Sequence, residues 1–276
     1  MINCCVNCSS PNYVRNGHDK EGVQRYKCCE CKRRFCEKGI FARHRYPVEL
    51  IMDAIFLYSQ PISTRGVVRN LKRFRKIEPS HVSVYNWVIK FASYIIKIAS
   101  IKPLNFSNEW HCDEKFIRVR KSRDPFAYLW IVSDSNSNII TTHVSFRRNI
   151  ESAKIVFEKA KQRTGFLPEI MVTDGLQAYK KACKKSFGKN TRHVVAHFEP
   201  ARIVHKKKLM KLSNNIAERI NQFPALRLHA IRGFKRLNRA NLLIEFFTIY
   251  YNYLMPHGEK EEVKVQWERV PTLINR

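Results

Sequence analysis

The stretch IMVTDGLQAY, residues 170–179, joins a short apolar run directly to a carboxylate and a glycine. The run Ile170–Thr173 has the composition of a buried strand, and this pattern ends at Asp174. Asp-Gly is a common turn dipeptide, so a turn that ends the strand accounts for the aspartate. The alternative is a carboxylate placed at the end of a strand to hold a metal ion. Asp174 alone does not decide between them, and its partners have to be found elsewhere in the chain.

The chain is strongly basic: its 276 residues include 51 Lys+Arg against 23 Asp+Glu, a formal net charge of +28. Hydrophobic residues make up 44%, which is enough for a core and excludes a disordered chain. This excess of positive charge predicts a polyanionic partner, and DNA is the first choice. A membrane is the competing partner, but no apolar run reaches the ~18 residues that span a bilayer. The most apolar late stretch, LLIEFFTIYYNYLM (242–255), contains Glu245 and predicts a core helix. With no signal peptide in MINCCVNCSS, we expect a cytoplasmic, nucleoid-associated protein.

Seven of the nine cysteines lie within the first 36 residues, and they include two Cys-x2-Cys pairs. Zinc binds four thiolates in a tetrahedron, and each Cys-x2-Cys turn supplies two of them. The residues between the pairs look like a hairpin, and a metal would provide the stability that this segment, poor in aliphatic residues, lacks. We predict a zinc ribbon over residues 1–41 with one structural Zn²⁺. Cys4 or Cys29 could replace a neighbour, but neither preserves both spacings. The predicted ligands are Cys5, Cys8, Cys28 and Cys31.

Residues 42–102 have helical periodicity and many basic side chains. The segments YPVELIMDAIFLYSQ, PISTRGVVRNLKRF and EPSHVSVYNWVIKF predict three short helices, with Ser80 as the N-cap of the third. Three such helices are compatible with a helix-turn-helix that binds DNA. The candidate DNA-binding residues of this region are Arg65, Arg69, Lys72, Arg73, Ser80, His81, Ser83 and Asn86.

The pattern changes near residue 103, where β-rich runs begin to alternate with helical ones. We predict strands over 109–120, 126–135, 138–146, 170–173 and 193–198, and helices over 150–165, 176–186 and from about 213 onward. A basic loop is expected at HKKKLMK (205–211). This order of elements predicts a mixed α/β domain over residues 103–260, followed by a tail at 261–276.

Two acidic residues are candidate partners of Asp174. Asp113 lies inside a strand-like run although aspartate is depleted in strands, and alternation turns its neighbour Glu114 to the opposite face. Glu218 lies near the start of the long helix, with Glu199 as its competitor. Two strand-borne aspartates and a helix-borne glutamate can converge on a pair of divalent cations, and Mg²⁺ prefers such oxygen ligands. Two ions of this kind stabilise both the attacking and the leaving oxygen of phosphoryl transfer.

Five motifs in this order resemble the DDE transposases of insertion sequences, in the IS-six-like group. They are WHCDEKFIRVR, VTDGLQAY, NNIAERINQ, AIRGFKRL and IYYNYLMPH, and the resemblance runs from about residue 43 to 260. It implies a ribonuclease-H-like catalytic domain in which Asp113, Asp174 and Glu218 bind two Mg²⁺ (or Mn²⁺) ions. Glu218 lies 44 positions after Asp174, which is longer than usual in the group. An insertion at HKKKLMK would account for this, and without one the choice of Glu218 over Glu199 weakens.

The resemblance also implies the activity: a DNA transposase that cuts at the terminal inverted repeats and joins the exposed 3′-OH to target DNA. Such enzymes often carry a zinc ribbon and a helix-turn-helix to bind these repeats. A homodimer or higher oligomer is expected, because two DNA ends must be joined. The alternatives are a non-catalytic regulator derived from a transposase and a stand-alone nuclease. Further candidate phosphate-binding residues are Arg219, Arg227, Arg232 and Lys235.

Overall fold

The computed structural model describes residues 4–5, 7–8, 10–19, 22–36, 45–101, 104–120, 126–196, 199–253 and 255, without the side chains of 97, 98, 100, 101 and 224–226. These residues form two compact units. The first contains the described residues up to Tyr58 together with Thr64–Ile101, and the second contains Ser59–Ser63 and the described residues of Lys102–Met255. The domain boundaries at residues 41, 102 and 260 stay predictions, and the tail at 261–276 lies outside the described residues.

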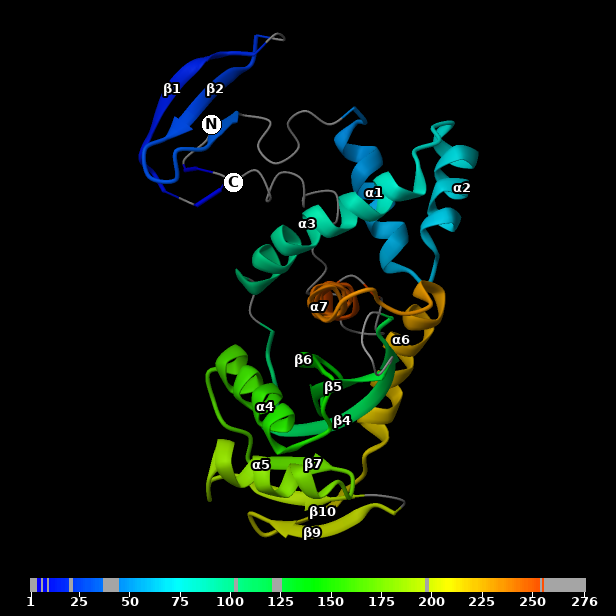
Figure 1. The fold of residues 1–276 in the computed structure, drawn as a ribbon. Coiled ribbons are helices and arrows are strands. Elements are labelled where there is room, and N and C mark those ends of the chain that lie inside the picture. Colours follow the sequence, from blue (N-terminus) through cyan, green and yellow to red (C-terminus); the bar gives the residue numbers. More distant parts are fainter. Residues whose placement is uncertain are drawn as a thin grey trace. The chain divides into compact units, whose positions relative to one another are not determined.

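The N-terminal part of the first unit is a three-stranded antiparallel sheet (Figure 1). It consists of β1 (Tyr13–His18), β2 (Gln24–Cys28) and β3 (Arg34–Cys36), paired in that order. The strands β1 and β2 form the hairpin expected between the two cysteine pairs. Three aromatic rings, those of Tyr13, Tyr26 and Phe35, pack on one another with centroids 5.2, 5.5 and 5.6 Å apart. So small a cluster needs another source of stability, which a metal would provide.

The same unit contains three helices, as the periodicity predicts: α1 (Val48–Ser59), α2 (Thr64–Arg75) and α3 (His81–Ile101). Ser80 is the N-cap of α3, because its Oγ accepts a hydrogen bond from the backbone N–H of Ser83 at 3.0 Å. Trp87 is buried and its ring meets that of Tyr46 edge-on, with centroids 5.2 Å apart. The early turns of α2 and α3 leave basic and polar side chains exposed.

A five-stranded mixed sheet organises the second unit (Figure 1). Its strands are β4 (Glu109–Arg118), β5 (Phe126–Asp134), β6 (Ile139–Ser145), β7 (Ile170–Thr173) and β8 (Arg192–Val195). Their order is β6-β5-β4-β7-β8; β4, β5 and β6 are antiparallel neighbours, whereas β7 is parallel to both β4 and β8. This order and these directions are those of the ribonuclease-H-like fold, so the expected fold class is confirmed.

Two helices cover one face of this sheet, α4 (Ile150–Thr164) and α5 (Gln177–Phe187). The predicted limits of α4 are confirmed by its caps: Asn149 Oδ1 accepts the N–H of Ser152, and Gly165 ends the helix with a φ of 78°. Trp110 and Cys112, two alternate residues of β4, point into this layer. The core between the helices and the sheet contains Trp110, Cys112, Trp130, Phe157 and Tyr179.

The opposite face is covered by α6 (Asn215–Ile231) and by a hairpin of β9 (Ala201–His205) and β10 (Lys208–Leu212). The hairpin's inner side packs against β7 and β8 in a cluster that contains Val172, Val194 and Leu212. The prediction of a loop at 205–211 is therefore wrong. Lys206 and Lys207 form a two-residue turn with φ values of 46° and 64°, and lysine is not a residue that marks such a turn. The hairpin lies between Asp174 and Glu218 in the chain.

Helix α7 (Leu237–Tyr253) is the predicted core helix, and it also covers the open edge of the sheet at β6. The side-chain amide of Asn241 accepts from the backbone N–H of Val144 at 2.9 Å and donates to its carbonyl at 3.2 Å. Asn252 does the same for Ile139, at 3.0 and 2.8 Å. The two amides take the place of a neighbouring strand, which an exposed edge would otherwise recruit. Among the helices within the described ranges, none is long and apolar enough to cross a membrane.

Candidate active site and zinc site

Asp113 and Asp174 come together because of the pairing of two parallel strands. The register of β4 and β7 places Cys112 beside Thr173, so the next residue of each strand, an aspartate in both cases, lies beside the other. Asp174 is the first residue after β7, and its Oδ1 accepts the N–H of Leu176 at 2.9 Å. It therefore belongs to the turn that ends the strand, and at the same time it forms a carboxylate pair with Asp113.

A third carboxylate joins this pair. One oxygen from each of Asp113, Glu114 and Asp174 lies within 4.8 Å of the other two. Burial raises the pKa of Asp113 to about 6, and the negative charges of Glu114 and Asp174 add to this rise. Crowded carboxylates of this kind are stabilised by a cation, and hard oxygen ligands suit Mg²⁺ or Mn²⁺. The aspartate pair therefore fits a divalent metal ion.

Glu114 lies on the face of β4 that alternation predicts, but its carboxylate still reaches the aspartate pair. Its side chain is only 5% exposed. Tyr179 Oη donates a hydrogen bond to Oε2, and Arg148 Nε donates to Oε1 at 2.6 Å. Alternation gives the direction in which a side chain leaves the strand, whereas the position of the carboxylate depends on these two partners from α5 and from the loop before α4.

Glu218 lies in the first turn of α6, on the helix face that contacts Asp113. Asn221, three residues later, donates from Nδ2 to Asp113 Oδ2 at 2.6 Å. Residues three apart share a face of a helix, so Glu218 lies one turn from this contact. The carboxylate of Glu218 is not one of the three that gather within 4.8 Å of one another. Glu199 is exposed in the segment that precedes β9, and its carboxylate is likewise outside that group.

The four predicted zinc ligands come together at one end of the first hairpin. Cys5 Sγ lies 3.7 Å from Cys31 Sγ, and Cys8 Sγ lies 3.5 Å from Cys28 Sγ. A tetrahedron with Zn–S bonds of ~2.3 Å has S–S edges of roughly 3.8 Å, whereas a disulfide would need ~2.05 Å. The separations therefore fit a tetrahedral metal site. Cys29, one of the alternatives, is exposed and, like Cys4, outside the four-sulfur group.

The predicted DNA-binding residues differ in exposure. Arg227 is 1% exposed: its guanidinium lies 4.9 Å from the centroid of the Phe247 ring and Nη1 donates to the carbonyl of Ile62 at 3.0 Å. This arginine belongs to the interior, so we leave it out of any DNA interface. Ser83 is half-buried. The exposed members are Arg65, Arg69, Lys72, Arg73, Ser80, His81, Asn86, Arg219, Arg232 and Lys235.

Three residues of the site went unnoticed in the sequence: Arg148, Tyr179 and Asn221. Asn221 could have been predicted from the sequence, because it lies three residues after Glu218 and so on the same face of the helix. Tyr179 follows Asp174 within the same motif, but it reads as an ordinary core aromatic. Arg148 is one of many basic residues and had no signal of its own.

The strand order, together with an aspartate pair where β4 and β7 meet, defines a class of protein: those with a ribonuclease-H-like fold. Comparison with family models agrees. Residues 107–255, just over half of the chain, match the model of the DDE domain of IS240-type transposases. The chain belongs to this DDE transposase family, which confirms the expected IS-six-like relationship.

Relatives and solved structures of the same kind are distant. The chain is 21% identical over 145 residues to the transposase for the insertion sequence-like element IS431mec of Staphylococcus aureus (strain Mu50). It has the same identity to the transposase for insertion sequence element IS257 in transposon Tn4003 of Staphylococcus aureus. Each match covers 52% of this chain and 63% of the relative, so the chain spans less than two thirds of these relatives' length.

Among solved structures, the HTLV-2 integrase catalytic core domain in complex with magnesium (trimeric form) is 15% identical, with a TM-score of 0.37. The match covers 60% of this chain and 98% of that one. The simian T-cell lymphotropic virus intasome in complex with PP2A regulatory subunit B56 gamma is 14% identical, with a TM-score of 0.41. That match covers 62% of this chain and 56% of the other.

Proposed function

We propose that the protein is a DNA transposase whose active site consists of Asp113, Asp174 and Glu218 with two Mg²⁺ or Mn²⁺ ions. The observation that carries this proposal is the register of β4 and β7, which sets two aspartates side by side in a chain of the DDE family. A DNA-binding regulator gains nothing from carboxylates that face a polyanion. The crowded acidic group therefore favours an enzyme.

The residues of the site have different roles. Two ions bound there would supply charge stabilisation for the attacking and leaving oxygens of phosphoryl transfer. Asp113 and Asp174 provide carboxylate ligands from neighbouring strands. Asn221 fixes Asp113 by donating to Oδ2, while the N–H of Glu114 donates to Oδ1 at 2.9 Å. Glu218, on the same face of α6 as Asn221, completes the ligand set.

The first unit would bind the ends of the element. The Cys5, Cys8, Cys28 and Cys31 group would hold one structural Zn²⁺ and so keep the ribbon folded. In the helical part, exposed arginines of α2 are suited to phosphates, and the start of α3 offers His81 and Asn86 to base edges. Because two terminal repeats must be joined to one target, the working form would be a homodimer or a larger oligomer on DNA.

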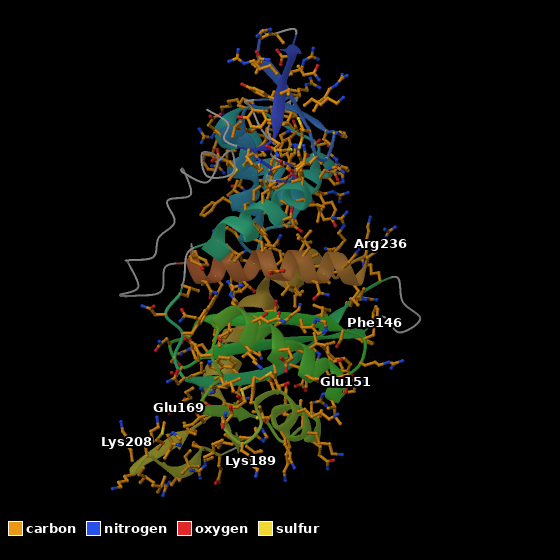
Figure 2. All side chains as sticks on the ribbon, turned by 90° about the vertical axis from the view of Figure 1, so that its left-hand side faces the viewer. Phe146, Glu151, Glu169, Lys189, Lys208 and Arg236 are labelled. Atoms are coloured by element: carbon orange, nitrogen blue, oxygen red, sulfur yellow. The ribbon has the colours of Figure 1, made fainter. Side chains whose placement is uncertain are left out.

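A set of glutamate variants tests the proposed third ligand. Glu218→Gln should lower Mn²⁺-dependent cleavage of a terminal-repeat duplex at least 100-fold, since it removes a charge that acts in the transition state. Glu151 is a matched control, because it too is an exposed glutamate in the first turn of a helix, α4 (Figure 2). Glu151→Gln should cleave at the wild-type rate.

Glu199→Gln completes this set. Wild-type activity in Glu199→Gln, together with loss in Glu218→Gln, supports Glu218. The reverse pattern would transfer the role to Glu199. Cleavage without joined products in the wild type would indicate a nuclease, and binding without cleavage would indicate a regulator.

A further inference from the structure

We propose that Arg148 binds the phosphate that is cut, and that Glu114 is a positioning residue that holds Arg148 rather than a third metal ligand. This inference rests on the proposed function and assigns roles to two residues of the same site. It starts from the loop between β6 and α4, where Arg148 lies. Both sides of that loop are fixed: Ser145 Oγ donates to the carbonyl of Arg147 at 2.8 Å, and Asn149 caps α4.

Glu114 already has a partner for each of its oxygens. Oε1 accepts from Arg148, through both Nε and Nη2, and Oε2 accepts from the hydroxyl of Tyr179. Tyr179 itself is buried in the core beneath the sheet. A metal ion that took Glu114 as a ligand would compete with an arginine and with a hydroxyl that has little access to water. Breaking such buried contacts is costly, so the carboxylate is better suited to hold Arg148.

Arg148 has part of its guanidinium left for another ligand. The group is planar and carries five N–H donors, and Glu114 uses the side formed by Nε and Nη2. Nη2 lies 4.0 Å from Asp174 Oδ2, so the guanidinium stands beside the aspartate pair. The side chain is 38% exposed, and Nη1 has no acceptor among the residues that the structure describes. A phosphate bound to metal ions that Asp113 and Asp174 hold would therefore lie beside an arginine that is already fixed in position.

The chemistry of cleavage needs such a donor. Water forms a bond to phosphorus while the bond from phosphorus to the 3′ oxygen breaks; the water gives up a proton and the 3′ oxygen gains one, leaving a 3′-OH and a 5′-phosphate. Negative charge on the non-bridging oxygens is stabilised by donors fixed in advance. Arg148 would donate to one of these oxygens and transfers no proton. One donor of this kind typically accounts for roughly 100-fold in rate.

Measuring metal affinity distinguishes whether Glu114 is a metal ligand or a positioning residue for Arg148. Titration calorimetry with Mn²⁺ compares the wild type with Asp113→Asn and with the double variant Glu114→Gln/Arg148→Met, which keeps the net charge of the pair. The double variant should bind Mn²⁺ within about threefold of the wild type, and Asp113→Asn at least tenfold more weakly. Equal weakening in both would make Glu114 a metal ligand and overturn the proposal. Unchanged binding in Asp113→Asn would overturn the proposed metal centre, and this proposal with it.

The contact to phosphate has its own test. Affinities are measured in Ca²⁺ for two terminal-repeat duplexes, one natural and one with a methylphosphonate at the cleavage position. In the wild type the natural duplex should bind more tightly than the methylphosphonate duplex. Arg148→Ala should reduce this preference roughly tenfold, which is what one hydrogen bond to a charged group contributes. Arg147→Ala, which removes the exposed neighbouring arginine, should keep the wild-type preference. An unchanged preference in Arg148→Ala would show a merely structural role and refute the contact.

Discussion

Asp113 and Asp174 lie side by side, one position beyond the paired residues Cys112 and Thr173 of two parallel strands. They are 61 positions apart in the sequence, and the whole β5–β6–α4 segment lies between them. Parallel neighbours need a crossover of this kind, and the crossover returns the chain so that the end of β7 lies beside the middle of β4. The carboxylate pair is therefore a consequence of the strand order and the register.

Without metal, the aspartate pair should make the folded protein less stable as the pH rises towards neutral. The pKa of Asp113 rises to about 6 on folding, mainly through burial. A carboxyl group with a raised pKa destabilises the fold when ionised, so this cost is absent below pH 4, grows between pH 4 and 6, and is complete above that range. The rise corresponds to about 3 kcal/mol at neutral pH as an upper figure.

The measurement is urea unfolding from pH 5 to 7.5 without metal, for the wild type and Asp113→Asn. The variant should be the more stable at pH 7.5, and the difference should shrink towards pH 5. The subtraction is needed because burial lowers the pKa of His143 to about 4, which destabilises the fold below about pH 6.5. A difference that does not change with pH would count against the raised pKa.

The ribbon should depend on zinc. Inductively coupled plasma mass spectrometry of the purified protein should find one zinc ion per chain. Cys28→Ser should lose this zinc, because three thiolates do not complete the tetrahedron. Cys29→Ser is the matched control: the residue is adjacent but lies outside the four-sulfur group. Full zinc in Cys28→Ser, or its loss in Cys29→Ser, would mean that the ligands are assigned wrongly.

The edge of the large sheet should depend on Asn241. Replacing it with alanine removes two hydrogen bonds to the backbone of Val144. We expect a loss of roughly 1–3 kcal/mol in the free energy of unfolding, since backbone groups are left without partners. Asn238→Ala, an exposed position near the start of the same helix, should change it by less than about 0.5 kcal/mol. Equal effects in both variants would show that helix propensity, and not the edge of β6, is responsible.

Much of this architecture is local enough to be predicted from the sequence. Alternation in β4, the capping residues of α4 and the apolar run of β7 each depend on neighbours in the chain. The sequence also predicted that Asp113 and Asp174 are partners, because a carboxylate is rare within a strand or at the end of an otherwise apolar strand. The contacts of Glu114 could not be predicted, since they depend on Arg148 and Tyr179, which only the fold brings near.

The hairpin after β8 escaped prediction for a different reason. Its turn consists of Lys206 and Lys207 in a left-handed conformation that usually marks Asn or Gly. Basic residues on either side made the segment look like a solvated loop. Ala201, Ile203, Met210 and Leu212 face β7 and β8, whereas Val204 and Leu209 of the same strands are exposed. Register and packing, and not local sequence preference, determine this element.

The most direct test of the central claim is strand transfer with Mn²⁺, in which a labelled duplex of the terminal repeat is joined to target DNA by the wild type or by Asp174→Asn. The variant keeps the shape and the Asx turn of the side chain but loses its charge. We predict joined products with the wild type and none with Asp174→Asn, while both bind the duplex equally well. Joined products from Asp174→Asn at the wild-type rate would contradict the account, because Asp113 and Asp174 would then not form the active site.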